Sequence, residues 1–280
     1  MEEKHGNNTA IALTIAGSDS GGGAGIQADL KTFSALGAYG ASVITAITAQ
    51  NTRAVTAVEV LSPALITAQI DAVFDDLPVN AVKIGMLASV PVIEAVAQAL
   101  DRAQAKRAVP VVLDPVMIAK SGDALLEQSA IASVRDVLLP RATVLTPNLP
   151  EAARLTQTSA AGDENAMHAQ GEALLALGAS AVLMKGGHGR GEACVDLLMS
   201  KQHAPLRLTA KRLATRNTHG TGCTLSSAIA AGLARGLTLE AAVTQAHAYL
   251  QNAIRAADDL YIGAGHGPVH HFHALWGAGT

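Results

Sequence analysis

The sequence has few aromatic residues, few cysteines and no long apolar run, and each shortage excludes a class of protein. Only 2% of the 280 residues are aromatic, so a core must be packed from Ala, Val, Leu and Ile, which favours close helix-on-sheet layers. The two cysteines, Cys194 and Cys223, lack metal-site spacing and are too few for a disulfide scaffold. No stretch approaches the ~18 apolar residues of a membrane span, and no basic amino-terminal region precedes an apolar one. We therefore expect a cytoplasmic protein with reduced cysteines and no membrane segment.

The charge balance is close to neutral, with 20 Lys and Arg against 23 Asp and Glu and a formal net charge of −3. The basic residues are scattered, so the sequence lacks the electrostatic footprint of a nucleic-acid-binding protein. A composition of 49% hydrophobic and 15% charged residues is typical of a globular chain. We find no repeat and no break in composition, and predict one domain over 1–280 with a loose segment at 1–9 and a docked carboxyl-terminal tail at 263–280.

Short apolar runs alternate with segments of helical spacing along most of the chain. The pattern predicts strands at 10–16, 41–49, 54–61, 81–84, 109–113, 143–145 and 181–184, and a hairpin formed by 193–199 and 206–213. It predicts helices at 26–36, 63–76, 90–105, 126–139, 150–155, 164–177, 221–234 and 239–257. This alternation is typical of an α/β protein with a mostly parallel sheet covered by helices on both faces.

The carboxyl ends of the predicted strands are polar, small or charged, although the strands before them are apolar. Ligands of open parallel sheets bind at this edge, so the pattern indicates one shared site. The six ends read Gly17-Ser18-Asp19, Gln50-Asn51, Gly85-Met86, Asp114-Pro115, Asn148 to Glu151, and Lys185-Gly186-Gly187.

A glycine turn before the helix at 221–234 is a candidate phosphate-binding site. The residues Gly220, Thr221, Gly222 and Cys223 lie where the first backbone N–H groups of a helix have no intrahelical partner. With the positive end of the helix dipole, these donors suit a phosphate. The chain contains no Gly-Lys dipeptide, which excludes a Walker A loop and leaves this turn as the phosphate-binding candidate. The alternative is an ordinary turn before an alanine-rich helix.

Several other motifs allow a functional and a structural interpretation. The segment 23–28 matches a dinucleotide pattern, but no acidic residue follows between Asp29 and Glu59, so we interpret it as a loop over a small substrate or a simple turn. Asn148 and Glu151 are either a helix cap or part of a Mg²⁺ site, in which Asp114 could also take part. Lys185 either reaches a phosphate or lies on the surface. Cys194 is predicted to be inert core, and the histidines of the tail are expected to be structural.

Seven motifs, in their order along the chain, resemble the hydroxymethylpyrimidine/phosphomethylpyrimidine kinases of thiamine biosynthesis, a family of the ribokinase-like superfamily. A further stretch in the tail, 267–273, resembles the same family. The resemblance extends from about residue 10 to the tail. The seven motifs are 17–29, 49–52, 83–87, 120–122, 146–152, 184–188 and 217–223.

The resemblance implies a three-layer α/β/α fold, the use of ATP and Mg²⁺, and a homodimer. It implies two successive phosphorylations of 4-amino-5-hydroxymethyl-2-methylpyrimidine, first on its hydroxyl and then on the resulting phosphate. Gln50 matches the residue that binds the pyrimidine, and its amide can both donate and accept hydrogen bonds. By the same likeness Asp29, the Gly17 backbone and Met86 complete the pocket. Asn148 and Glu151 match the N-x-x-E motif for metal and phosphates, with Lys185 and Asp114 beside the ATP phosphates.

Cys223 stands where the superfamily usually carries an aspartate as general base. A thiol has a pKa near ~8.5, and the start of a helix lowers it, so Cys223 could act as the base of the first transfer. The second acceptor is already an anion with a second pKa of ~6 and needs little base. We therefore expect Cys223→Ala to slow the first phosphorylation more than the second.

Two other functions remain open from the sequence. A pyridoxal or pyridoxine kinase on the same scaffold would also phosphorylate a hydroxymethyl group on a nitrogen ring, although Gln50 with Asp29 favours the pyrimidine. A pyrimidine-binding protein without catalysis could retain the pocket. The set of Asp114, Asn148, Glu151, Lys185 and Cys223 favours a kinase.

Overall fold

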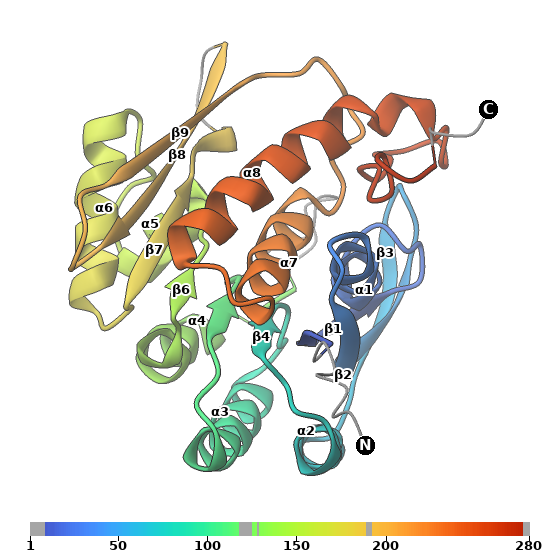
Figure 1. Cartoon of the computed structure of the whole chain (residues 1–280), viewed down its shortest axis with the longest axis vertical. Helices are drawn as coiled ribbons and strands as arrows, with labels where there is room; N and C mark the ends of the chain where they lie inside the picture. The colour runs from blue at the N-terminus through green and yellow to red at the C-terminus, as the bar shows by residue number, and fades with distance from the viewer. Residues whose placement is uncertain (1–8, 118–124, 128, 189–191, 277–280) are drawn as a thin grey trace, which may run out of the picture.

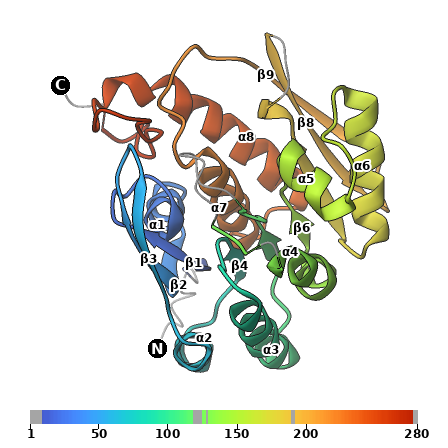
Figure 2. The same ribbon diagram turned by 180° about the vertical axis from the view of Figure 1, so that it is seen from behind.

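The computed structural model describes residues 9–117, 125–127, 129–188 and 192–276. The predicted loose segment at 1–9 lies outside this part of the chain except for Thr9, and the motif at 120–122 lies wholly outside it. Figure 1 shows the chain viewed down its shortest axis, and Figure 2 shows the same ribbon from behind.

The described strands form one nine-stranded sheet in the order β3-β2-β1-β4-β5-β6-β7-β8-β9. Strands β2, β1, β4, β5, β6 and β7 run parallel, and β3, β8 and β9 pair antiparallel at the two edges. The predicted mostly parallel sheet is thus confirmed. The strands are β1 (Ile11–Asp19), β2 (Tyr39–Gln50), β3 (Val55–Val60), β4 (Ala81–Ile84), β5 (Val111–Leu113), β6 (Val144–Leu145), β7 (Ala181–Lys185), β8 (Ala193–Ser200) and β9 (Leu206–Lys211).

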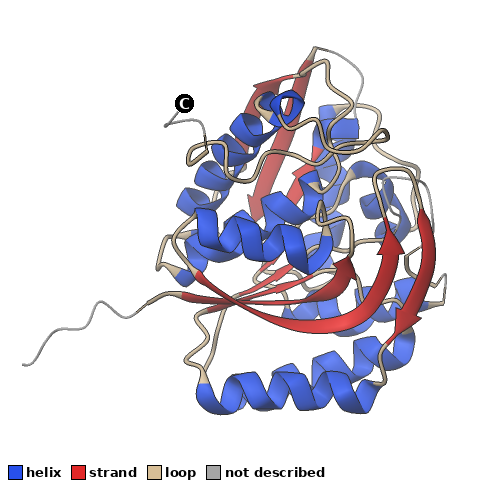
Figure 3. Cartoon of the chain, turned by 90° about the vertical axis from the view of Figure 1, so that its right-hand side faces the viewer, coloured by secondary structure: helices blue, strands red, loops and turns tan. Residues whose placement is uncertain are grey.

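Helices cover both faces of the sheet and complete a three-layer α/β/α fold (Figure 3). One layer contains α1 (Gly25–Ala35), α7 (Thr221–Ala234) and α8 (Leu239–Arg255). The other contains α2 (Pro63–Asp76), α3 (Val90–Lys106), α4 (Ala130–Ser133), α5 (Leu149–Thr156) and α6 (Glu164–Ala176).

The two sides of the sheet have different cores because side chains alternate along each strand. On β1, Leu13 and Ile15 face the α2 and α3 layer, whereas Ala12 faces the α7 and α8 layer. Helix α7 contributes the buried Ala228, Ala230 and other small residues to that second core. With almost no aromatic side chains between them, α7 packs close to the strands and its first turn reaches the edge of the sheet.

Two predicted elements differ from the structure by more than two residues at an end. The helix predicted over 126–139 begins only at Ala130, because the Glu127 N–H donates to the Ala88 carbonyl at 3.1 Å and Leu126 bridges to the same residue. Its second half is a π-helical turn, Val134–Leu138, followed by a 3₁₀ turn, Leu139–Arg141. Strand β1 runs three residues past its predicted end, since Asp19 pairs with Thr48 of β2 after a shift of register at Gly17.

The sheet has its topological switch at β1, because β2 follows on one side and β4 lies on the other. Ligands of doubly wound sheets bind outside the carboxyl ends of the strands at such a point. The segment after α8 returns to this edge, where His219 N–H donates to the Gly267 carbonyl at 3.0 Å and His266 N–H to the Thr52 carbonyl at 2.8 Å. The switch, the start of α7 and the tail therefore meet at one end of the sheet.

Candidate active site

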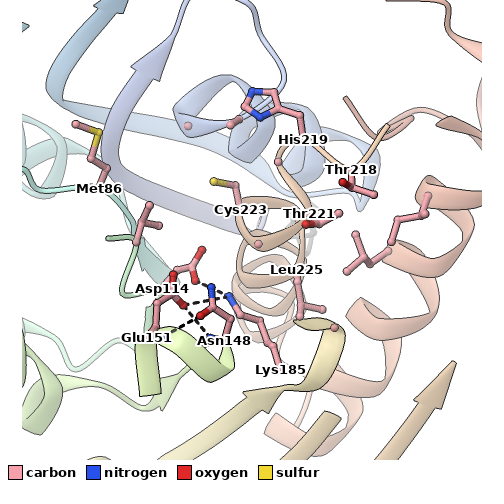
Figure 4. Close-up of a pocket in the computed structure, with 18 of the residues that line it drawn as sticks. Met86, Asp114, Asn148, Glu151, Lys185, Thr218, His219, Thr221, Cys223 and Leu225 are labelled. Atoms are coloured by element: carbon pink, nitrogen blue, oxygen red, sulfur yellow. Dashed lines mark hydrogen bonds and ion pairs between the residues drawn. The ribbon is translucent and has the colours of Figure 1, made fainter. Parts of the chain in front are cut away.

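A cavity of about 760 Å³ lies at this edge of the sheet, within the size range of small-molecule sites. Figure 4 shows Met86 and Cys223 toward one part of it and a charged cluster, Asp114, Asn148, Glu151 and Lys185, in another. Of the residues that the sequence predicts for a site, the cavity brings together Gly17, Gln50, Met86, Asp114, Asn148, Glu151, Lys185, Gly220, Thr221, Gly222 and Cys223.

The turn before α7 has the geometry expected of an anion site. Gly220 is the N-cap, with a left-handed φ of 80°, and no side chain caps the helix. A Cβ at Gly220 would lie 1.9 Å from the carbonyl oxygen of Gly23, so only glycine fits. The turn therefore presents backbone N–H groups of Gly222 and Cys223 that no side-chain cap occupies, as a phosphate requires.

The charged cluster lies directly against this turn. Lys185 Nζ is 2.9 Å from Asp114 Oδ1 and 4.0 Å from Glu151 Oε2, and a Cβ at Gly222 would be 3.5 Å from both Lys185 Nζ and Asp114 Oδ2. Burial alone would raise the pKa of Asp114, but Lys185 and Lys83 hold it below its ordinary value. A buried cation and a charged carboxylate thus flank the place where the turn would hold an anion.

Asn148 and Glu151 form a capping box at the start of α5. The Asn148 N–H donates to Glu151 Oε2 and the Glu151 N–H donates to Asn148 Oδ1, each at 2.8 Å. Burial raises the pKa of Glu151 to about 7, although the charge of Lys185 acts to lower it. A cation bound nearby would stabilise the ionised carboxylate. The helix-cap interpretation of the motif is therefore confirmed, and Glu151 also lines the cavity, while its role in a Mg²⁺ site stays a prediction.

The donor set fits Mg²⁺ bound together with phosphates. Mg²⁺ prefers oxygen ligands and is commonly held by one or two carboxylates plus the phosphates of the substrate. Asp114 and Glu151 supply such oxygens beside the anion turn. Within the described residues, no group of three or more His, Cys, Asp or Glu side chains could hold a metal by itself.

Cys223 differs from its sequence prediction. The start of α7 was expected to lower the pKa of the thiol, but burial raises the pKa of Cys223 to about 11. Lys83 and the Gly25 N–H favour the thiolate, whereas the carboxylates of Asp29 and Asp114 oppose it. Loss of water around the sulfur outweighs the Lys83 cation and the Gly25 N–H, so the thiol keeps its proton at neutral pH.

Asp29 also differs, because it is fully buried and does not line the cavity. Its carboxylate accepts hydrogen bonds from Thr14 Oγ1 and Ser227 Oγ, both at 2.6 Å, and from Lys83 Nζ at 2.9 and 2.8 Å. We correct the implied substrate contact: Asp29 joins β1, β4 and α7 beneath the site. Lys83, which the sequence analysis did not single out, lines the cavity as its buried partner. A lysine within an apolar strand was the available signal, since a buried lysine needs a partner.

Other cavity residues were also missed or misplaced. Cys194 is half-buried and lines the cavity, so the prediction that it lies in the core is wrong. Asp19 and His219 form a buried pair beside the turn. An apolar wall of the cavity, which no sequence motif revealed, consists of Leu213, Leu225, Leu250 and Ile254.

Together, the three-layer fold and a cavity that joins an anion turn to a buried Lys–Asp–Glu cluster define a ribokinase-like phosphotransferase. Residues 19–270 match the sequence model of a family described as phosphomethylpyrimidine kinase. The chain belongs to this phosphomethylpyrimidine kinase family.

Individual proteins are similar to this chain over most of its length. The hydroxymethylpyrimidine/phosphomethylpyrimidine kinase of Rhizobium meliloti is 62% identical over 268 residues, which cover 96% of this chain and 99% of the relative. The crystal structure of phosphomethylpyrimidine kinase from Clostridium difficile 630 is similar with a TM-score of 0.77 and 48% identity, covering 88% of this chain and 100% of that one. An ADP complex of Bacillus subtilis pyridoxal kinase has a TM-score of 0.85 and 36% identity over 95% of this chain and 98% of its own.

Proposed function

We propose that this chain transfers a phosphoryl group from ATP to 4-amino-5-hydroxymethyl-2-methylpyrimidine and then to its monophosphate, as a step of thiamine biosynthesis. The relatives that carry this activity in their names support the substrate. The observation that carries the proposal is the single cavity in which Gln50 and Met86 face the same space as the anion turn and Lys185. An acceptor site and a phosphate site that share one cavity are what phosphoryl transfer needs, because it depends mainly on positioning and charge stabilisation.

The phosphate end would hold ATP. Lys185 and Asp114 lie beside Gly222, and Asn148 lines the same cavity, so these side chains and the N–H groups of Gly222 and Cys223 would surround the transferred phosphoryl group as it develops charge. Mg²⁺, held near Glu151 through water, would neutralise the phosphate oxygens when bound. The apolar wall formed by Leu213, Leu225, Leu250 and Ile254 suits the adenine ring.

The acceptor end would hold the pyrimidine. The Gln50 amide matches the donor and acceptor edge of an aminopyrimidine. Met86 and the backbone of Gly17 would pack on the ring. A Cβ at Gly17 would lie 3.0 Å from Met86 Sδ, so a side chain there would displace Met86. Asp29 would act indirectly, from beneath the pocket. Its carboxylate accepts hydrogen bonds from Lys83 Nζ and from the Ser227 hydroxyl of α7 and so holds both in place.

Cys223 acts in this proposal through its backbone N–H rather than as a thiolate. With a pKa of about 11, only about one thiol in 10,000 is ionised at pH 7. A loose phosphoryl-transfer transition state leaves little covalent chemistry for the protein to perform, so a weakly activated hydroxyl can serve as acceptor.

A pyridoxal kinase is the second candidate, because the fold of the Bacillus subtilis pyridoxal kinase is similar over 95% of this chain. ATP-dependent phosphorylation assays with the pyrimidine, its monophosphate and pyridoxal distinguish the candidates. We expect the largest kcat/KM for the two pyrimidines and a smaller one for pyridoxal. A preference for pyridoxal would overturn the proposal, and pyrimidine binding without ADP release would favour a non-catalytic binding protein.

We also propose that the chain is a single ribokinase-like domain that forms a homodimer. Tyr39, Ile47, Val58 and Val60 expose 41–57% of their surface on β2 and the edge strand β3, which is apolar area that a second copy could cover. A cytoplasmic location is proposed because the reaction consumes ATP. Among the described helices, none is long and apolar enough to cross a membrane.

A further inference from the structure

The cavity continues past the anion turn, away from the acceptor end. Figure 4 shows Met86 on one side of Cys223, and Leu225 and Thr218 on the other. On that far side the Gln251 side chain of α8 lines the cavity together with the apolar wall. The wall consists of Leu213, Leu225, Leu250 and Ile254.

Helical spacing explains why Gln251 accompanies this wall. On a helix of 3.6 residues per turn, positions 250, 251 and 254 fall within an arc of about 100°. Leu250 is buried, whereas Gln251 and Ile254 are half-buried. The amide of Gln251 therefore comes from the same face of α8 as two members of the apolar wall.

The side-chain amide of Gln251 is free to bind a ligand. It makes no hydrogen bond to any residue in the described part of the chain. The amide of Asn148, which also lines the cavity, is engaged in the helix cap, where its Oδ1 accepts from the Glu151 N–H at 2.8 Å. Gln251 thus presents one unpaired acceptor and an unpaired NH₂ donor side by side, next to an apolar surface.

An adenine ring requires this combination of groups. Its faces are apolar, and its edge carries an amino donor beside a ring-nitrogen acceptor, which a glutamine amide can bind with two hydrogen bonds. Small-molecule sites commonly join an apolar lining to a few polar groups that fix the orientation of the ligand. The anion turn and Lys185 would hold the phosphates of the same nucleotide.

We propose that Gln251 is the residue that recognises the adenine base of ATP, through its amino group and the adjacent ring nitrogen. The inference rests on the proposed function, in which the apolar wall takes the adenine ring. The amide oxygen accepts from the amino group, and the amide NH₂ donates to the ring nitrogen. A base without the amino group leaves the amide oxygen unpaired, which disfavours that nucleotide.

The test compares ATP with purine riboside 5′-triphosphate, whose base has the same ring but lacks the amino group. The values of kcat and KM for each nucleotide are measured at saturating pyrimidine, in the unmodified full-length enzyme and in Gln251→Met. In the unmodified enzyme we expect kcat/KM to be about fivefold higher for ATP, the effect of one neutral hydrogen bond. In Gln251→Met this ratio should fall to about one, while the KM for the pyrimidine changes by less than about twofold.

Gln245→Met is the matched control, because Gln245 is a half-buried glutamine of the same helix that does not line the cavity. It should keep the fivefold ratio. Methionine and glutamine have similar helix propensities, so neither substitution should disturb α8. Gln251→Glu keeps an oxygen that can accept from the amino group. It should therefore retain the preference for ATP, even where its charge weakens the binding of both nucleotides.

Equal kcat/KM for the two nucleotides in the unmodified enzyme would overturn the inference, and so would an unchanged ratio in Gln251→Met. Loss of the ratio in Gln251→Glu would also overturn it, because the acceptor oxygen is still present there. The first and third criteria remain if Gln251→Met fails to fold, as judged by thermal melting. If the enzyme phosphorylates the pyrimidine but gives one of these results, the inference alone fails. If pyrimidine and ATP yield no ADP, the proposed function fails and the inference falls with it.

Discussion

Replacing Lys83 with methionine should destabilise the protein strongly, because it leaves the Asp29 carboxylate buried without its cation. Both side chains are 0% exposed, and Lys83 Nζ supplies two of the four hydrogen bonds that Asp29 accepts. Breaking a buried ion pair on one side costs about 3–5 kcal/mol, since the remaining charge stays desolvated. Methionine fills a similar volume, so the loss of packing contributes little.

The assay is equilibrium unfolding in urea, read as a change in midpoint at constant slope. A loss of this size corresponds to a fall in melting temperature of about 5–9 °C, because the unfolding entropy is about 2.1 cal/mol/K per residue and the chain has 280 residues. Removing both partners in Lys83→Met with Asp29→Leu should recover part of the loss, because no unpaired charge remains.

A matched control removes an exposed ion pair. Arg102 Nη2 lies 3.1 Å from Asp71 Oδ1 with side chains 51% and 47% exposed, so Arg102→Gln should cost about 1 kcal/mol or less. If Lys83→Met proved no more destabilising than Arg102→Gln, the view that the Asp29 and Lys83 pair fixes α7 beneath the site would be wrong.

Three further predictions concern the turn, the thiol and the tail. Gly220→Ala should lower kcat about a hundredfold in steady-state assays, because its Cβ would strike the Gly23 carbonyl and distort the anion site; near-normal kcat would contradict that role. Cys223→Ala should slow both phosphorylations by similar, modest factors in single-turnover assays, since burial raises the pKa of the thiol to about 11; a selective loss of the first transfer would restore the thiolate as its base. Burial lowers the pKa of His271 to about 3 from an ordinary 6.5, so the unfolded chain binds the extra proton between these values and stability should fall by up to about 1.4 kcal/mol per pH unit as pH drops through that window. His271→Gln should flatten this part of the stability curve, measured by urea unfolding at each pH, and an unchanged slope would refute the assignment.

The sequence predicted most of the architecture because hydrophobic periodicity and helix-start signals are local. Ser62-Pro63 marked the start of α2, and the Asn148 and Glu151 spacing anticipated the capping box of α5. The helix predicted over 126–139 was wrong where a contact distant in sequence intervened, since Ala88 takes the N–H of Glu127. Local patterns cannot show such a competing partner.

The sequence predicted which residues gather at the site, but it did not predict their burial or their pKa values. The family resemblance wrongly placed Asp29 in the pocket, although Asp29 lies three residues after Ile26 and four before Phe33, which is the spacing of the buried face of α1. The pKa of Cys223 depends on burial, which no motif encodes. The Asp19 and His219 pair joins residues 200 positions apart, which only the folded chain brings together.

In the proposed function, the enzyme carries out two successive phosphoryl transfers to a pyrimidine in one cavity. The most direct measurement is the amount of ADP released for each molecule of 4-amino-5-hydroxymethyl-2-methylpyrimidine consumed, with both phosphorylated products quantified and Gly220→Ala run in parallel. We predict two ADP for each pyrimidine at completion, with the diphosphate as end product and little turnover by the variant. Release of a single ADP with the monophosphate as end product, or pyrimidine binding with no ADP at all, would contradict the account.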